Sequence, residues 1–149
     1  MKWALVALIF PVAAIAAPSP DTVANGKLMA SDWQYVVQKV AAGDKAWLDA
    51  VPSLAPKADR EQADQLEDAL ATALPKSTKD VLSTLRVLDA GSYPNMAGTD
   101  IVCVQKVASL GRAAEKYYNN TRLELLDEPD GAQCLWNLEG VWEEVKRSK

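Results

Sequence analysis

The side chains in this sequence that could carry out chemistry are carboxylates, hydroxyls and two cysteines, because its 149 residues include no histidine. Without an imidazole the chain has no Ser-His-Asp or Cys-His nucleophile system and no histidine ligand for zinc or iron. It carries 16 Lys and Arg against 20 Asp and Glu, a formal net charge of −4. This composition leaves binding, or chemistry carried out by carboxylates, as the functions to weigh.

Paired carboxylates are the one catalytic arrangement that the spacing offers. Asp64 and Asp68 are one helical turn apart, and Glu67 lies on the same flank. A glycan-cleaving pair needs one carboxyl in an apolar setting that raises its pKa. These acids fall on the polar side of a predicted helix, opposite Leu66 and Leu70. We therefore expect solvated carboxyls there.

The densest acidic run, at residues 127–131, does not have the spacing of a calcium loop. Such a loop needs oxygen ligands at alternating positions and a final bidentate glutamate, whereas Pro129 occupies one of those positions. A glycine-rich phosphate loop is also missing from the sequence. We expect a solvated turn, no metal and no cofactor.

The first residues have the pattern of a signal peptide. Lys2 is followed by an uncharged apolar run to Ile15, with small residues at positions 14 and 16. The run is shorter than the ~20 residues of a membrane-spanning helix, and two prolines follow it. Residues 1–16 are therefore predicted to direct export and to be cleaved, which leaves a periplasmic or secreted protein with no membrane anchor.

Export gives the two cysteines a structural role. Cys103 and Cys134 are the only pair in the chain, and neither lies in a Cys-x-x-Cys motif. In an oxidising compartment they are expected to form one disulfide. The chain entropy lost by the unfolded state corresponds to about 3.5 kcal/mol of stabilisation.

The rest of the chain is predicted to be all-α, a compact single domain of six or seven short helices with one disulfide. Apolar residues recur at spacings of three and four, and no sustained strand alternation occurs. Residues 17–30 are expected to be partly disordered, and residues 31–149 form the helical domain. Caps, glycines and prolines place helices at residues 32–42, 44–54, 59–74, 77–90, 99–117, 121–127 and 132–146.

Aromatic residues off the apolar stripes are the candidate partner contacts. Trp136 lies beside the stripe of the last helix and two residues after Cys134, so we expect it to be exposed. Tyr93 and Met96, in the longest loop, and Tyr118 have the same character. The remaining tryptophans of the predicted helices, at positions 33, 47 and 142, fall on apolar stripes and are expected in the core.

Several segments carry a resemblance to known proteins: VAAGD at 40–44, WL at 47–48, LAP at 54–56, ALATALP at 69–75 and VL at 81–82. Together they resemble small exported helical proteins of Gram-negative bacteria whose function is uncharacterised. The signal peptide, all-α domain and single disulfide are also similar in architecture to periplasmic immunity proteins of secreted toxins. The resemblance implies no active-site residue, because architecture does not fix function.

These observations favour a non-enzymatic exported protein that binds a protein partner, as an immunity protein or inhibitor does. Its acidic balance would speed encounter with a basic partner and argues against nucleic-acid binding. One alternative is a cell-wall glycan hydrolase that uses Asp64, Asp68, Glu124 or Glu128. Another is a carrier of a small apolar ligand between helices.

Overall fold

The computed structural model describes residues 17–26 and 29–149, so the predicted signal peptide at residues 1–16 lies outside the described residues. The described part confirms the all-α prediction and contains more helices than predicted. These are α1 (Pro20–Asn25), α2 (Ala30–Ala41), α3 (Lys45–Leu54), α4 (Arg60–Ala73), α5 (Thr78–Ala90), α6 (Thr99–Val102), α7 (Gln105–Ser109), the 3-10 helix η1 (Gly111–Ala113), α8 (Ala114–Leu126) and α9 (Ala132–Arg147).

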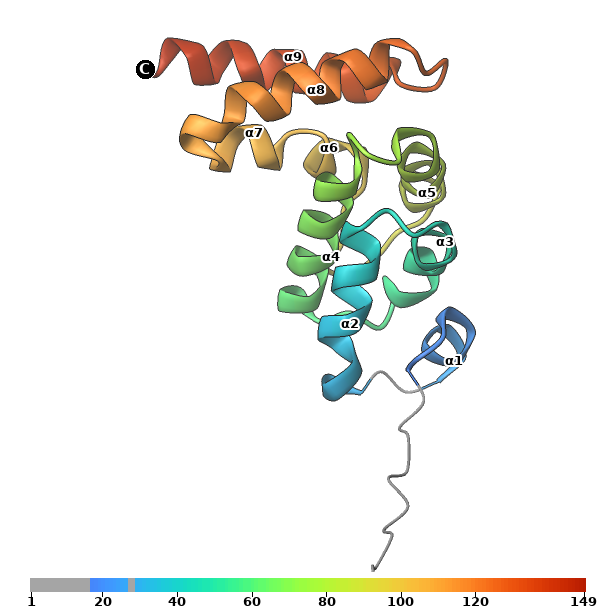
Figure 1. Ribbon diagram of the computed structural model, residues 1–149. Helices are drawn as coiled ribbons and strands as arrows, with labels where there is room; N and C mark the ends of the chain where they lie inside the picture. The colour runs from blue at the N-terminus through green and yellow to red at the C-terminus, as the bar shows by residue number, and fades with distance from the viewer. Residues whose placement is uncertain (1–16, 27–28) are drawn as a thin grey trace, which may run out of the picture.

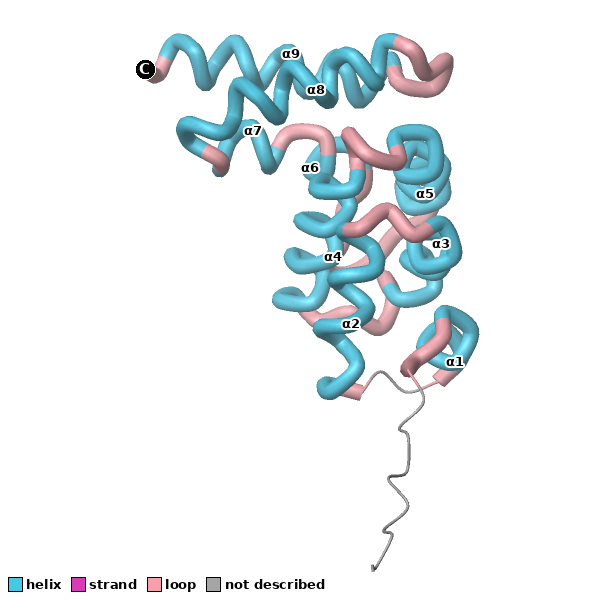
Figure 2. Tube along the Cα trace, viewed as in Figure 1, coloured by secondary structure: helices cyan, strands magenta, loops and turns pink. Residues whose placement is uncertain are grey.

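The helices form a body and a long antiparallel pair laid across one end of it (Figure 1). Helices α2 to α5 make the body, in which α2 packs on α4 and α3 packs on α5. Helices α8 and α9 make the pair, and the short α6 and α7 connect it to α4. Figure 2 shows that short loops join most of these helices. Helix α9 lies at the end of the molecule farthest from α1.

The core is built from the apolar stripes that the sequence predicts. Trp33, Trp47 and Trp142 are 8%, 4% and 7% exposed, which confirms their place in the core. Burial of side chains of this size is the main stabilising contribution to a helical domain. The largest side chains that are fully buried are Leu48, Leu54, Leu66, Leu70, Leu74, Leu85, Leu125 and Leu138.

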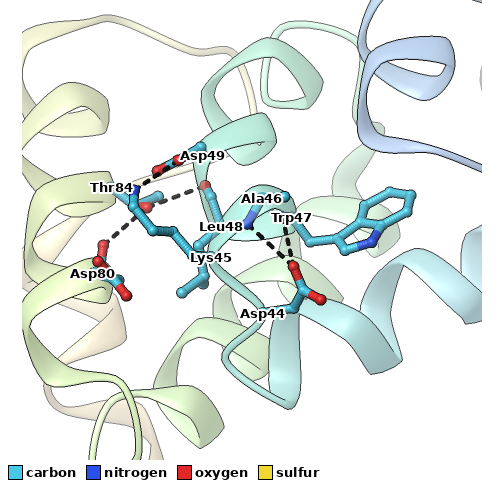
Figure 3. A network of polar contacts seen from close by, with 8 residues as sticks. All are labelled: Asp44, Lys45, Ala46, Trp47, Leu48, Asp49, Asp80 and Thr84. Atoms are coloured by element: carbon cyan, nitrogen blue, oxygen red, sulfur yellow. Dashed lines mark hydrogen bonds and ion pairs between the residues drawn. The ribbon is translucent and has the colours of Figure 1, made fainter.

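Polar caps fix where α3 begins and how it meets α5. The Asp44 carboxylate accepts hydrogen bonds from the amides of Ala46 at 3.1 Å and Trp47 at 3.4 Å (Figure 3). The buried Thr84 hydroxyl of α5 donates to the carbonyl of Leu48 at 3.1 Å. The Asp44 contacts give hydrogen-bond acceptors to amides of the first turn that have no partner within the helix. The Thr84 contact fixes the position of α5 along α3.

The predicted capping box at the start of α4 is confirmed. The Asp59 carboxylate accepts from the Gln62 amide at 2.9 Å, and the Gln62 side chain accepts from the Asp59 amide at 3.1 Å. Two amides that have no partner within the helix are satisfied in this way. Helix α4 therefore starts where the sequence predicts, and its start determines which residues face the core.

Part of the N-terminal segment is helical and packs on the core. Partial disorder within residues 17–30 stays a prediction; in this segment α1 (Pro20–Asn25) begins with a capping box between Ser19 and Thr22. Val23 is 5% exposed and belongs to the core cluster. Lys57 donates hydrogen bonds to two backbone carbonyls of the segment. These contacts come from residues distant in sequence, so local pattern alone gave no signal of them.

The helix predicted at residues 99–117 is broken into α6, α7 and η1, and α8 then runs without interruption to Leu126. Gly111 has φ 57°, a left-handed conformation that a continuous right-handed helix excludes. Cys103 ends α6, where the disulfide holds the chain against α9. The break turns α8 so that it pairs with α9 instead of extending along the body.

We expect Gly43→Ala to destabilise the protein by about 2 kcal/mol, as measured by urea unfolding. Gly43 has φ 78°, and an added Cβ would lie 2.9 Å from the Ser77 Cβ. Gly111→Ala is the matched control, because its φ is also positive but nothing lies within 4 Å of an added Cβ. The control should lose about 1 kcal/mol. Equal losses in both variants would show that the contact with Ser77 contributes nothing.

Candidate functional site

The predicted disulfide is present. It joins Cys103 to Cys134 with a Cα–Cα distance of 5.4 Å, and both cysteines are 1% exposed. The bond ties the end of α6 to the first turn of α9. Both thiols of the chain are used in this bond, so cysteine chemistry is not available to the folded protein. A disulfide of this kind is typical of proteins in oxidising compartments.

Trp136 lies on the solvent side of α9, as predicted, with 77% of its surface exposed. The buried stripe of α9 runs through Cys134, Leu138 and Trp142. Trp136 is two residues from Cys134 and two from Leu138, which places it on the other side of the helix. A tryptophan left this exposed, on a helix tethered by a disulfide at its start, presents a large apolar surface to solvent.

Two hollows flank Trp136, and both include Gly140 one helical turn further along. The first, between α8 and α9, has a volume of about 460 Å³, and the second, between α6 and α9, of about 390 Å³. The first is lined by Tyr118, Arg122, Trp136, Glu139, Gly140 and Glu143. The second is lined by Asp100, Val104, Trp136, Asn137, Gly140, Val141 and Glu144.

Gly140 has no structural reason to be glycine. It lies in the middle of α9, it has no positive φ, and an added Cβ would meet no atom within 4 Å. A glycine in a helix interior costs roughly 0.5–1 kcal/mol relative to alanine. The glycine therefore lowers the stability of α9, and because it has no side chain it leaves the two hollows beside Trp136 unfilled.

The two hollows differ in charge. Around the first, Arg122 pairs with Glu139 at 3.0 Å and Lys146 pairs with Glu143 at 2.6 Å. The charges of that hollow are therefore largely balanced. Exposed pairs of this kind contribute little to stability, so they mainly set the local potential.

The second hollow keeps two carboxylates without a cationic partner. Asp100 and Glu144 form no ion pair with any residue that the structure describes. Among the described residues, Asp100 accepts a hydrogen bond only from the side-chain amide of Asn137, at 3.2 Å. This hollow therefore combines an exposed indole and two valines with uncompensated negative charge, which is the chemistry that holds a lysine or arginine side chain.

The other predicted contact residues lie in two places. Tyr118 is stacked on Trp142 at a ring distance of 4.8 Å and lines the first hollow, so it joins Trp136. Tyr93 and Met96 line a separate cavity near α4. Met96 is only 6% exposed and packs in the core. The prediction that Met96 is exposed for contact with a partner is therefore corrected.

The expectation that Glu67 lies on a solvated face is wrong. Glu67 is 5% exposed because the loop at residues 93–97 covers this side of α4. Its Oε1 accepts a hydrogen bond from the Ala97 amide at 2.6 Å. Burial raises the pKa of Glu67 above its usual value of 4.5, and the nearby Asp64 carboxylate raises it further.

The acids on which the hydrolase hypothesis rests are not gathered at one cavity. Of the four, Asp64 lines the cavity beside Glu67, and Asp68 pairs with Lys106 at 2.6 Å. Glu124 and Glu128 lie at the far end of α8 and in the turn after it. Within the part of the chain that the structure describes, no three acidic or cysteine side chains cluster as metal ligands.

No known protein family matches the chain, and no curated protein or solved structure is significantly similar to it. The resemblance to exported helical proteins and to immunity proteins thus stays a prediction. Across residues 17–26 and 29–149 no helix has the length and apolar character needed to cross a membrane. The outer face of α9 and the cavity beside Glu67 are the two features that bear on function.

Replacing Glu67 with glutamine is expected to change how stability depends on pH. The raised pKa means that the folded state binds this proton more tightly than the unfolded chain. Glu67 therefore contributes stability below pH 4.5 that is lost as the pH rises through its folded-state pKa. Glutamine keeps an oxygen for the Ala97 amide but removes the titration.

Urea unfolding of both proteins at about pH 4 and about pH 7 checks this prediction. The free energy of unfolding of the wild type, minus that of Glu67→Gln, should be smaller at about pH 7 than at about pH 4. Glu61→Gln removes an exposed carboxylate from the same helix and serves as the charge control. Identical pH dependence in the wild type and in Glu67→Gln would contradict the assignment.

Proposed function

We propose that this is an exported, non-enzymatic helical protein, periplasmic or secreted, that binds a protein partner through the outer face of α9. The observation that carries the proposal is Trp136, 77% exposed beside a glycine that the fold does not require. Exposed tryptophans at the centre of a low surface are typical of interface hot spots. An immunity protein or an inhibitor would bind its target in this way.

The charges around Trp136 favour a basic partner. A lysine or arginine side chain laid in the second hollow would place its stem on Val104 and Val141 and its cation between Asp100 and Glu144. The cation would also lie near the indole face, an arrangement worth roughly 0.5–2 kcal/mol. The net charge of −4 would speed the approach of such a partner.

Support for export comes from the predicted signal peptide at residues 1–16 and from the disulfide. In an exported protein the Cys103–Cys134 bond forms during maturation and orders α9 before the partner is met. The resemblance to small exported proteins of Gram-negative bacteria supports the same compartment. Partner binding and compartment are thus parts of one proposal.

Site-specific photocrosslinking tests the proposal. Trp136 is replaced by benzoylphenylalanine, and the protein is irradiated in the periplasm or culture medium of its native source. The control carries the same residue at Val87, which is 51% exposed on α5. We expect a discrete adduct with a basic protein at position 136 and none at position 87. The same adducts from both positions, or none from either, would reject the α9 face as the binding surface.

A further inference from the structure

We propose that the cavity between α4 and the loop at residues 93–97 binds a small zwitterion, a free amino acid with its ammonium and carboxylate groups. The cavity has a volume of about 390 Å³, within the range of small-molecule sites and at its lower end. None of its lining residues lines either hollow beside Trp136. The inference is therefore independent of partner binding by α9.

One wall of the cavity is a single helix face with opposite charges at its ends. Arg60, Asp64 and Glu67 follow one another at spacings of four and three, so they lie on the same side of α4. The ends of this row are about 10 Å apart along the helix axis. A long arginine side chain can shorten that separation to the size of a small ligand.

The Arg60 end favours a carboxylate. Arg60 is the first residue of α4, where the helix dipole is positive. Its guanidinium has no ion-pair partner among the residues that the structure describes. A guanidinium offers paired donors in a plane that matches a carboxylate, so a ligand carboxylate would fill this position.

The Glu67 end favours an ammonium group. More than nine-tenths of Glu67 is buried, and its Oε1 is held by the Ala97 amide at 2.6 Å. Its other oxygen receives no hydrogen bond from a described residue and keeps some exposed surface, on the side where Glu67 lines the cavity. A carboxylate oxygen in this setting gains most from a charged donor.

Asp64 strengthens the preference for a cation at that end. Its carboxylate lies one turn before Glu67 and faces the same cavity. Burial and this neighbouring charge both raise the pKa of Glu67, so a bound ammonium would relieve a cost that the empty site carries. Affinity should consequently fall as the pH is lowered and Glu67 becomes protonated.

The opposite wall is largely apolar, and two hydrogen bonds hold its loop in place. Tyr93 and Ile101 present apolar surface to the cavity and would contact the ligand's side chain. The loop is fixed by the Asn95 side chain, which donates to the Ala58 carbonyl at 3.1 Å, and by the Ala97 contact with Glu67. A wall fixed before binding lowers the entropy cost of taking up a ligand.

Calorimetric titration of the folded chain with three probes tests the proposal. L-phenylalanine carries both charges, phenethylamine carries only the ammonium, and 3-phenylpropionate carries only the carboxylate. We expect L-phenylalanine, or the best of the common L-amino acids, to bind at least about ten-fold tighter than either half. Equal binding of all three probes, or no saturable binding of any amino acid at millimolar concentration, would overturn it.

Variants assign the two ends of the site. Glu67→Gln should weaken the binding of the amino acid and of phenethylamine about ten-fold and leave the binding of 3-phenylpropionate unchanged. Arg60→Gln should weaken the binding of 3-phenylpropionate about ten-fold and leave that of phenethylamine unchanged. The matched control is Glu61→Gln, an exposed acid of α4 outside the cavity lining. Equal losses in Glu61→Gln and Glu67→Gln would mean a general charge effect and reject the site. Crosslinking at position 136 stays the separate test of partner binding.

Discussion

Replacing Cys103 and Cys134 together with alanine is expected to lower the free energy of unfolding by about 3–4 kcal/mol. The bond closes a loop with a sequence separation of 31, so its loss frees many conformations of the unfolded chain. Alanine is chosen because both positions are buried and a serine hydroxyl would lack a partner there. Urea unfolding of the variant and of the reduced wild type measures the loss.

The same substitution should loosen one end of the molecule first. The bond is the covalent link between α6 and α9, and those two helices form the walls of the second hollow. Hydrogen exchange should therefore rise in α9 before it rises in α2 to α5. A loss below about 1 kcal/mol, or uniform exchange along the chain, would show that packing alone fixes α9.

Trp136→Ala is expected to weaken partner binding by about 2 kcal/mol or more, roughly thirty-fold in Kd. The indole is the largest side chain that lines both hollows, and the helix that carries it is tethered by the disulfide before binding. Because 77% of it is exposed in the free protein, its removal should change the free energy of unfolding by less than about 0.5 kcal/mol. A large loss of affinity without loss of stability is the signature of a contact residue.

Val87→Ala is the matched control for this prediction, because Val87 is 51% exposed but lies on α5. Its effect on affinity should stay within about two-fold. If the captured partner binds Trp136→Ala as tightly as the wild type, the indole is an exposed residue without a role in recognition.

Much of the fold could be predicted from local signals. The caps at Asp44 and Asp59 act through hydrogen bonds to residues two or three positions away, so the sequence contains both partners. Helical spacing identified the core tryptophans and left Trp136 outside the stripe. The disulfide followed from there being one cysteine pair in a chain with a predicted export signal.

Features that depend on distant segments were missed for a physical reason. Glu67 is buried by the loop at residues 93–97, and helical periodicity gives no information on which loop will cover a face. One local signal did exist, because Glu67 is four residues after Ala63 and four before Ala71, both fully buried. An acidic residue between two alanines on the same helix face indicates that another segment packs over its carboxyl group.

Titration of the captured partner against Gly140→Leu tests the central claim most directly. The substitution removes no side chain, and an added Cβ at this position meets no atom within 4 Å. Leucine also favours the helix over glycine, by roughly 0.8 kcal/mol. It does, however, fill the low surface beside Trp136. We predict at least a ten-fold weaker affinity together with unchanged or higher stability. Affinity equal to that of the wild type would contradict a partner seated on the outer face of α9.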